Sequence, residues 1–195
     1  MRDEWVLAVE RAYAAAARGA NEDALAGDDD ARSLAEARAA AAAVASRYLA
    51  VGTPRSFGLV VGPAERELGA LVLAAHRTWF EPRDLRCTDE ALAVSIGARV
   101  VTEDEALAAD IVCTCAAIAL APSRLRRGTH VNALGEISID PELRALAMIA
   151  DEARGLPALA AGLVDGRQLD EITVFVAGTA PIARAALRAI RAGAI

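Results

Sequence analysis

Short apolar runs alternate along most of the chain with segments that carry apolar residues at helical spacing. The runs lack the polar alternation of a half-exposed strand, which is typical of strands covered on both faces. Strands are predicted at residues 57–61, 85–88, 98–101, 110–115, 129–133, 146–150 and 172–175. Helices or helical turns are predicted at residues 4–17, 32–50, 65–76, 91–96, 103–108, 140–143 and 181–190, and a loop at 116–127.

This alternation predicts an α/β fold, a doubly wound parallel sheet with helices on both faces. We expect residues 1–50 to supply two preceding helices and residues 51–195 to form the sheet and a closing helix. In the second helix, Ser33 is the predicted N-cap and Glu36 its capping-box partner. The acidic stretch 21–30 before it is either an exposed loop or a negative flank that suits the helix dipole.

Composition narrows the function classes. The 195 residues are 55% hydrophobic and 25% charged, which fits one folded domain and excludes a disordered chain. The net charge is −6 without a basic stripe, so nucleic acid is not an expected partner. All 21 basic residues are arginine, which excludes mechanisms that need a lysine. No apolar run approaches the roughly 20 residues that span a bilayer, and the charged start is unlike a secretory signal; we expect no membrane partner and a cytoplasmic protein.

Cysteines and histidines are few. Cys87, Cys113 and Cys115 are an odd number with a one-residue gap between the last two, which predicts buried thiols rather than disulfides or a zinc site. His76 stands near the end of a predicted helix, where its positive form would suit the dipole. His130, inside a predicted strand, is either structural, the interpretation we favour, or a general base. No metal site is expected.

The turn after the first predicted strand lies where such folds cradle a dinucleotide. The fingerprint of that site is G-x-G-x-x-G/A, and only Gly62 remains of it. Ala64 adds a methyl group where the phosphates come closest, and Pro63 removes a backbone donor. Glu65 and Glu67 add negative charge. The position fits a dinucleotide fold, but these residues argue against conventional tight binding.

Five collinear segments resemble one family. Residues 32–50 (RSLAEARAAAAAVASRYLA) resemble the helix LTALRTAAASALAARYLA of the ornithine cyclodeaminase/μ-crystallin family, and residues 109–114 (ADIVCT) resemble its strand ADIVVTAT. Residues 128–135 (GTHVNALG) are nearly its GTHVNAVG, and residues 139–143 (IDPEL) match its ELDPEL. The closing residues 171–183 resemble its EITVFDSVGLAIED. Order and spacing together make the resemblance specific.

The resemblance implies a Rossmann-like fold and small-molecule chemistry. Members of the family are NAD(P)-dependent enzymes of amino and imino acids, and they pair the Rossmann domain with an antiparallel β domain that binds substrate and builds the dimer. Stretch 21–30 stands where that β domain is expected, and the family's catalytic lysine has no counterpart. The chain thus resembles a truncated, diverged member, expected to pair with itself or with a relative.

The resemblance also implies roles for individual residues. Arg38 matches the arginine that grips the substrate carboxylate, a bidentate task suited to guanidinium. Asp89 is either a ribose-binding acid or a solvated acid at a strand end. The candidate catalytic residues are Arg38, Glu136, Asp140 and His130, and the candidate cofactor-binding residues are Gly62, Ala64, Asp89, Thr114, Asn132 and Gly135.

Three function classes remain open. The first is a reduced enzyme of amino- or imino-acid metabolism, in biosynthetic tailoring for example, that uses NAD(P) or no cofactor. The second is a cofactor-independent lyase, isomerase or cyclase in which Glu136, Asp140 or His130 moves protons. The third is a non-catalytic binding or assembly subunit. The lost glycines favour the second and third classes, and the retained 129–135 edge favours the first and second.

Overall fold

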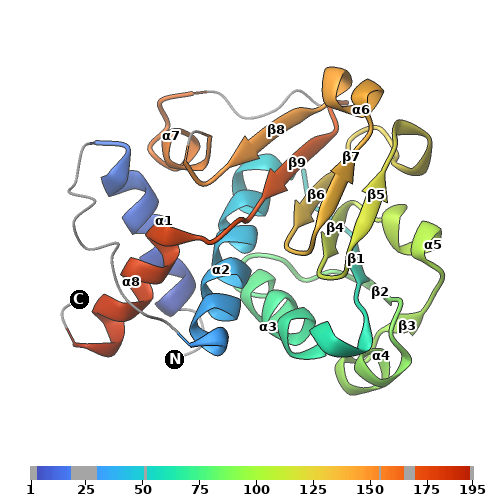
Figure 1. Ribbon diagram of the computed structural model, residues 1–195, viewed down its shortest axis with the longest axis horizontal. Coiled ribbons are helices and arrows are strands. Elements are labelled where there is room, and N and C mark those ends of the chain that lie inside the picture. The colour runs from blue at the N-terminus through green and yellow to red at the C-terminus, as the bar shows by residue number, and fades with distance from the viewer. Residues whose placement is uncertain (1–3, 19–29, 51, 154, 165–169, 194–195) are drawn as a thin grey trace.

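The computed structural model describes residues 4–18, 30–50, 52–153, 155–164 and 170–193. Its centre is a seven-stranded parallel sheet of order β3-β2-β1-β4-β6-β9-β8 (Figure 1). The strands are β1 (Ser56–Val60), β2 (Asp84–Cys87), β3 (Arg99–Val100), β4 (Ile111–Thr114), β6 (His130–Ala133), β8 (Met148–Asp151) and β9 (Thr173–Val176). The helices are α1 (Glu4–Ala16), α2 (Ala31–Leu49), α3 (Arg66–His76), α4 (Glu90–Ile96), α5 (Glu103–Leu107), α6 (Pro141–Leu146), α7 (Leu156–Ala160) and α8 (Pro181–Arg191), with short 3₁₀ turns η2 (Pro63–Glu65) and η3 (Pro122–Arg124).

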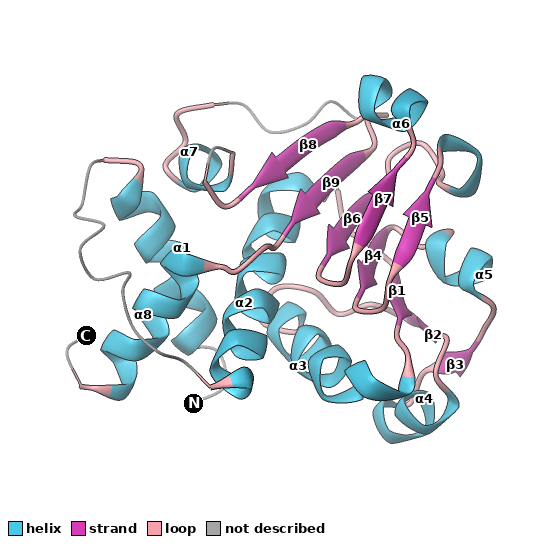
Figure 2. Cartoon of the chain, in the orientation of Figure 1, coloured by secondary structure: helices cyan, strands magenta, loops and turns pink. Residues whose placement is uncertain are grey.

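The predicted fold class is confirmed, because the strands are parallel and helices lie on both faces (Figure 2). The predicted loop 116–127 is partly wrong, since it contains strand β5 (Ile118–Leu120), which pairs with β7 (Ile137–Ile139) in a separate two-stranded sheet. Three-residue strands carry too few positions for a periodic signal. The short helix α7 is likewise absent from the prediction. No helix in the described part of the chain has the length and apolar character needed to cross a membrane.

The two faces of the sheet bury separate apolar clusters. Phe57 and Leu59 face the cluster that includes α1, α2, α3 and α8, whereas Val60 faces the cluster around α5. This assignment follows from the strand period of two. At Gly58, a Cβ atom would stand 2.1 Å from the carbonyl oxygen of Ala106, so glycine lets α5 pack directly on β1. The central strands β1, β4 and β6 are thus buried on both faces, as the mainly apolar sequences of β1 and β4 predict.

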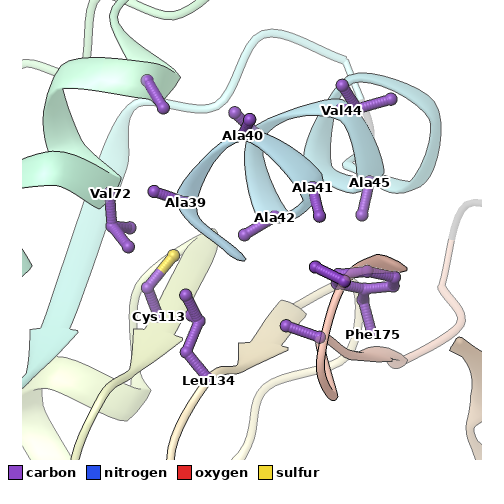
Figure 3. Packing of buried hydrophobic residues seen from close by; sticks show 14 of the residues in the cluster. Ala39, Ala40, Ala41, Ala42, Val44, Ala45, Val72, Cys113, Leu134 and Phe175 are labelled. Atoms are coloured by element: carbon purple, nitrogen blue, oxygen red, sulfur yellow. The ribbon is translucent and has the colours of Figure 1, made fainter. Parts of the chain in front are cut away.

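Helix α2 lies on the sheet through a surface of small side chains. Its alanines from Ala39 to Ala43 and Ala45 have no exposed surface. Figure 3 shows Ala42 and Ala45 directed toward Leu134 and Phe175 of the sheet side. Alanine favours the helix and lets its backbone approach the strands closely. The alanine run is therefore the packing surface that joins α2 to the sheet.

The start of α2 differs from the prediction. The N-cap is Asp30, whose side chain accepts a hydrogen bond from the backbone N–H of Ser33 at 2.7 Å. Ser33 is inside the helix, and its hydroxyl accepts a hydrogen bond from Arg191 at the end of α8. The helix begins at Ala31, so Ser33 lies in its first turn instead of before it, and the predicted Ser33–Glu36 capping box is wrong. Residues 21–29 of the predicted acidic loop lie outside the described residues.

Candidate functional site

The carboxyl ends of the parallel strands meet at one edge of the sheet, where ligands of such folds bind. Arg38 reaches this edge from the first half of α2, and it is close enough to Cys115, directly after β4, for their charges to interact. The Arg38 side chain is half-buried, and its Nε atom is buried without a hydrogen-bond partner among the described residues. Burial lowers the pKa of this guanidinium. Among the described residues, this cation at the edge has no ion-pair partner.

Burial and neighbouring charges act on the thiol of Cys115. Burial raises the pKa of this thiol to about 12; the positive charge of Arg38 lowers it, and the negative charge of Glu65 raises it. Neither Arg38 nor Glu65 has an ion pair within the described part of the chain. All three cysteines are free and buried, as predicted. An arginine and a glutamate thus lie near one inert thiol without contacting each other.

The turn after β1 does not fit a diphosphate. Oε2 of Glu65 lies 2.7 Å from the point where a Cβ atom would stand on Gly62, so this carboxylate folds back over the glycine. The backbone N–H of Glu65 donates to the carbonyl oxygen of Gly62 at 3.1 Å, and Pro63 has no N–H to offer. Ala64 is exposed beside them in η2. A negative side chain occupies the place where a phosphate would need donors.

The acid expected to bind ribose is already engaged. Asp89 caps α4 by accepting a hydrogen bond from the N–H of Leu92 at 2.8 Å. Arg66 donates to both of its oxygens, from Nε at 2.8 Å and from Nη2 at 2.9 Å. These contacts lower the pKa of Asp89, with the Arg66 hydrogen bond as the largest cause. A ribose would have to displace Arg66, so neither half of the turn fits a dinucleotide.

His130, Asn132 and Thr114 lie inside the protein. Each has no exposed surface, and the hydroxyl of Thr114 donates to the carbonyl oxygen of Asn132 at 3.5 Å. Beneath α2, Nε2 of His130 lies 3.1 Å from Oδ1 of Asn132, and Nδ1 lies 2.7 Å from Oγ1 of Thr173. Nδ2 of Asn132 donates to Oγ of Ser46 at 2.8 Å. The structure therefore gives His130 the structural position that the sequence favours.

The same network reaches His76. Nε2 of His76 lies 2.9 Å from Oγ of Ser46, and Nδ1 lies 2.7 Å from the carbonyl oxygen of Val72. Since that carbonyl can only accept, Nδ1 carries the proton and Nε2 accepts from the serine hydroxyl. Burial lowers the pKa of His76 to about 4, so the imidazole is neutral at pH 7. The prediction of a charged His76 at the helix dipole is wrong, because the ring points into the core.

The remaining predicted residues are spread over both ends of the sheet. Gly135 follows β6 at the carboxyl edge, where a side chain would begin 2.4 Å from the carbonyl oxygen of Ala116, so this glycine permits a close backbone approach. Glu136 is next to it and exposed. Asp140 is exposed and caps α6 by accepting a hydrogen bond from the N–H of Glu142 at 2.8 Å. Helix α6 lies at the opposite end of the sheet (Figure 1), so Asp140 does not join Arg38.

Glu152, which is not among the residues predicted from the sequence, also follows a strand at the carboxyl edge. Its Oε1 accepts hydrogen bonds from the hydroxyl of Tyr13 at 2.5 Å and from the N–H of Ala183 at 3.0 Å. Burial raises its pKa, and Oε2 is buried without a partner. The carboxyl group caps α8, whose own N-cap residue is Ala180. The available signal was its position, two residues after the predicted strand 146–150.

Other features do not add to the site at the carboxyl edge. Among the described residues, no three histidine, cysteine or acidic side chains are grouped to hold a metal ion. Two surface hollows lie at the amino ends of the strands, away from Arg38. One is lined by Thr53, Pro54, Arg55, Glu81 and Arg83, and the other by Asp104, Ala108, Ser123, Arg124, Leu125 and Arg126. We favour the carboxyl edge, because loops there approach ligands in open parallel sheets.

Comparison with known proteins gives matches in structure only. No protein-family model matches the chain, and no curated protein matches it in sequence. An archaeal alanine dehydrogenase dimer with bound NAD is 21% identical, with a TM-score of 0.67 over 80% of this chain and 64% of that one. A pyrroline-2-carboxylate reductase of Thermococcus litoralis, in complex with NADH and L-proline, is 18% identical, with a TM-score of 0.60 over 84% and 67%.

A third match is a probable ornithine cyclodeaminase from Bordetella pertussis, 20% identical, with a TM-score of 0.64 over 82% of this chain and 66% of that one. This chain therefore spans less than two thirds of the cyclodeaminase and of the alanine dehydrogenase. At such identities, the likeness concerns the fold. The chain thus has the Rossmann-like fold of structures of the ornithine cyclodeaminase/μ-crystallin type, as its sequence resemblance implies.

Proposed function

We propose that this chain acts on a small carboxylate derived from an amino or imino acid, which Arg38 binds at the carboxyl edge of the sheet. The supporting observation is the half-buried Arg38 guanidinium, whose Nε has no partner among the described residues. A buried donor without a partner costs about 1–3 kcal/mol, and a carboxylate is the group that a guanidinium binds in bidentate fashion. A ligand carboxylate would remove that cost.

The structural matches support the ligand class. They include enzymes named for alanine, for pyrroline-2-carboxylate and for ornithine, all small molecules with one carboxylate. Two of these structures hold NAD or NADH, but the Glu65 carboxylate over Gly62 and the Arg66–Asp89 pair leave no fitting dinucleotide site here. The proposed function therefore includes no hydride step.

Proton transfer within the proposed function falls to the exposed side chains of the edge. Of the three candidates, His130 has no exposed surface and Asp140 lies at the opposite end of the sheet. Glu136 is exposed and follows β6 at the carboxyl edge. We therefore assign to Glu136 the general acid–base role, in which a carboxylate accepts a proton from the bound molecule and returns it.

Ligand titration tests the proposed function. Thermal shift and calorimetry with a panel of amino and imino acids should show saturable stabilisation, which reaches about 2.7 kcal/mol at a ligand concentration of 100 times Kd. Arg38→Gln should weaken binding at least about tenfold, since it removes a charged bidentate contact. The matched control is Arg77→Gln, an exposed arginine at the end of α3. Equal binding by the Arg38 and Arg77 variants would contradict the proposal.

We propose an assembly role as the second candidate function, supported by the edge strand β8. This strand pairs only with β9 among the described strands, and Ile149 on it is 37% exposed. An unpaired strand edge with an apolar side chain offers a surface for a second copy of the chain. Sedimentation should then show a dimer that Ile149→Arg dissociates. A monomer at all concentrations would exclude this role.

A further inference from the structure

Two Pro-Arg pairs stand at the amino ends of neighbouring strands. Pro54 and Arg55 come directly before β1, and Pro82 and Arg83 come directly before β2. The backbone N–H of Arg83 donates to the carbonyl oxygen of Arg55 at 2.9 Å, and the residues that follow the two arginines are paired in the parallel register. Neighbouring strands lie about 4.8 Å apart. The sheet therefore holds two arginines next to each other at its amino edge.

Further backbone contacts fix this pair. The N–H of Arg55 donates to Oδ2 of Asp110 at 2.8 Å, and its carbonyl oxygen also accepts from the N–H of Asp84 at 3.1 Å. A proline with a fixed φ precedes each arginine. Arg55 and Arg83 are both exposed, and these contacts use only their backbones. Their guanidinium groups therefore remain available to a ligand.

A surface hollow of about 230 Å³ lies beside the pair. It is lined by Thr53, Pro54, Arg55, Glu81 and Arg83. Across the part of the chain that the structure describes, neither arginine side chain has an ion pair or a hydrogen bond, and Glu81 pairs with neither of them. Like charges held on neighbouring strands repel each other. The hollow thus combines two adjacent cations with space for an anion.

Other arginines of the same edge have acidic partners. Nη2 of Arg99 lies 3.8 Å from Oδ1 of Asp84, and Nη2 of Arg126 lies 3.5 Å from Oδ1 of Asp110. Acidic residues also outnumber basic ones in the chain, 27 to 21. The unpaired arginines at the hollow therefore do not follow from a shortage of acids.

We propose that this hollow binds a small phosphate monoester, with Arg55 and Arg83 on the phosphate oxygens. A phosphate monoester carries a charge of about −1.5 to −2 at pH 7 and three strong acceptor oxygens, so one group satisfies two guanidinium groups. A carboxylate carries a single charge and suits one guanidinium. The hydroxyl of Thr53 adds a further donor at the hollow. This site lies away from Arg38 and does not depend on the proposed function.

Glu81 works against the phosphate at the proposed site. Its carboxylate adds a negative charge to a hollow whose two arginines attract the phosphate. Because Glu81 is exposed, water and salt weaken the repulsion without removing it. Replacement of Glu81 by glutamine should therefore strengthen phosphate binding, the opposite of the effect of replacing either arginine.

Isothermal calorimetry tests the site on the full chain. The probes are inorganic phosphate, glycerol 3-phosphate and glycerate, which carries a carboxylate on a similar skeleton. We expect glycerol 3-phosphate to bind at least about tenfold more tightly than glycerate, since it meets both arginines. Arg55→Gln and Arg83→Gln should each weaken both phosphate compounds at least about tenfold. Glu81→Gln should strengthen both about threefold.

Two control variants separate this site from general attraction to arginine. Arg127→Gln removes another exposed arginine of the amino edge, ahead of β6 and outside the hollow, and Arg38→Gln removes the arginine of the carboxyl edge. Both should leave phosphate affinity unchanged. Equal losses in Arg127→Gln and Arg55→Gln, or no binding of either phosphate compound, would overturn the site. Equal affinity for glycerate and glycerol 3-phosphate would overturn the assignment of a phosphate.

Discussion

The polar groups beneath α2 differ from those at the carboxyl edge of the sheet in whether they have partners within the protein. Beneath α2, Ser46, His76, Asn132, His130 and Thr173 are buried together and joined by hydrogen bonds of 2.7 to 3.1 Å. At the edge, Arg38 and Glu65 are half-buried, and neither has an ion pair with another residue that the structure describes. The first arrangement lowers the free energy of the fold, and the second leaves interactions for another molecule to make.

The network also shows why two histidines do not make an active site. His76 donates from Nδ1 to a carbonyl oxygen and accepts at Nε2 from Ser46, so both ring nitrogens are engaged. His130 likewise has polar neighbours at both nitrogens. Neither has any exposed surface. A general base needs a free nitrogen within reach of a ligand, and the structure provides none in either ring.

The largest expected effect comes from breaking the network at its centre. Asn132→Ala leaves His130 and Ser46 without their shared partner in the core, which should lower the free energy of unfolding by about 3 kcal/mol. Urea denaturation measures it. The control, Ser138→Ala, alters an exposed side chain on β7 and should change stability by less than about 0.5 kcal/mol. Similar losses for both variants would mean that the network adds nothing.

The second expected effect is that acid destabilises the protein through the same buried network. The pKa of His76 is about 4 in the folded protein and near its ordinary 6.5 in the unfolded chain, which therefore binds more protons between these values. Stability should fall by about 3 kcal/mol as pH drops from 6.5 to 4. Denaturation across this range measures the slope. A His76→Gln variant should lose that part of the slope, and an unchanged slope would assign it to other groups.

Much of this fold follows from local pattern. Buried strands such as β1 and β4 are short and mostly apolar, a pattern typical of strands covered on both faces, so it could be recognised in the sequence. The direction in which a side chain points is harder to predict from the local sequence. His76 ends an amphipathic helix and so suggests a charged role, yet its ring turns inward to Ser46, a contact 30 residues away that no periodicity encodes.

The candidate site was predictable only in part. Arg38 and the altered turn at Gly62 are visible as sequence motifs, and the structure puts both at one edge. The engagement of Asp89 by Arg66 depends on how α3 sits against α4, and the burial of Glu152 depends on α1 and α8. Such contacts join elements far apart in sequence, so composition and spacing leave them open.

A smaller change should come from removing the unbalanced cation. Arg38→Gln takes away a half-buried charge whose Nε has no partner, so the ligand-free protein should become more stable. Partial exposure screens the effect, which we expect to be about 0.5 kcal/mol, or roughly 1–2 °C in Tm. Differential scanning calorimetry resolves this shift. The exposed control Arg77→Gln should not change Tm, and a loss of stability in Arg38→Gln would indicate an internal partner instead.

The smallest expected effect concerns dinucleotides. NAD, NADH, NADP and NADPH should leave the Tm of the wild-type chain unchanged, because Glu65 covers Gly62 and Arg66 holds Asp89. The double variant Glu65→Gly, Arg66→Gln removes both obstacles but keeps Pro63, so it should gain only weak affinity, with a Kd near 1 mM, equivalent to about 4 kcal/mol of binding free energy. Thermal shift with each nucleotide tests both chains. Saturable stabilisation of the wild type at micromolar nucleotide would show that the carboxyl edge still binds a diphosphate. The difference between this edge and the buried network beneath α2 would then depend on Arg38 alone.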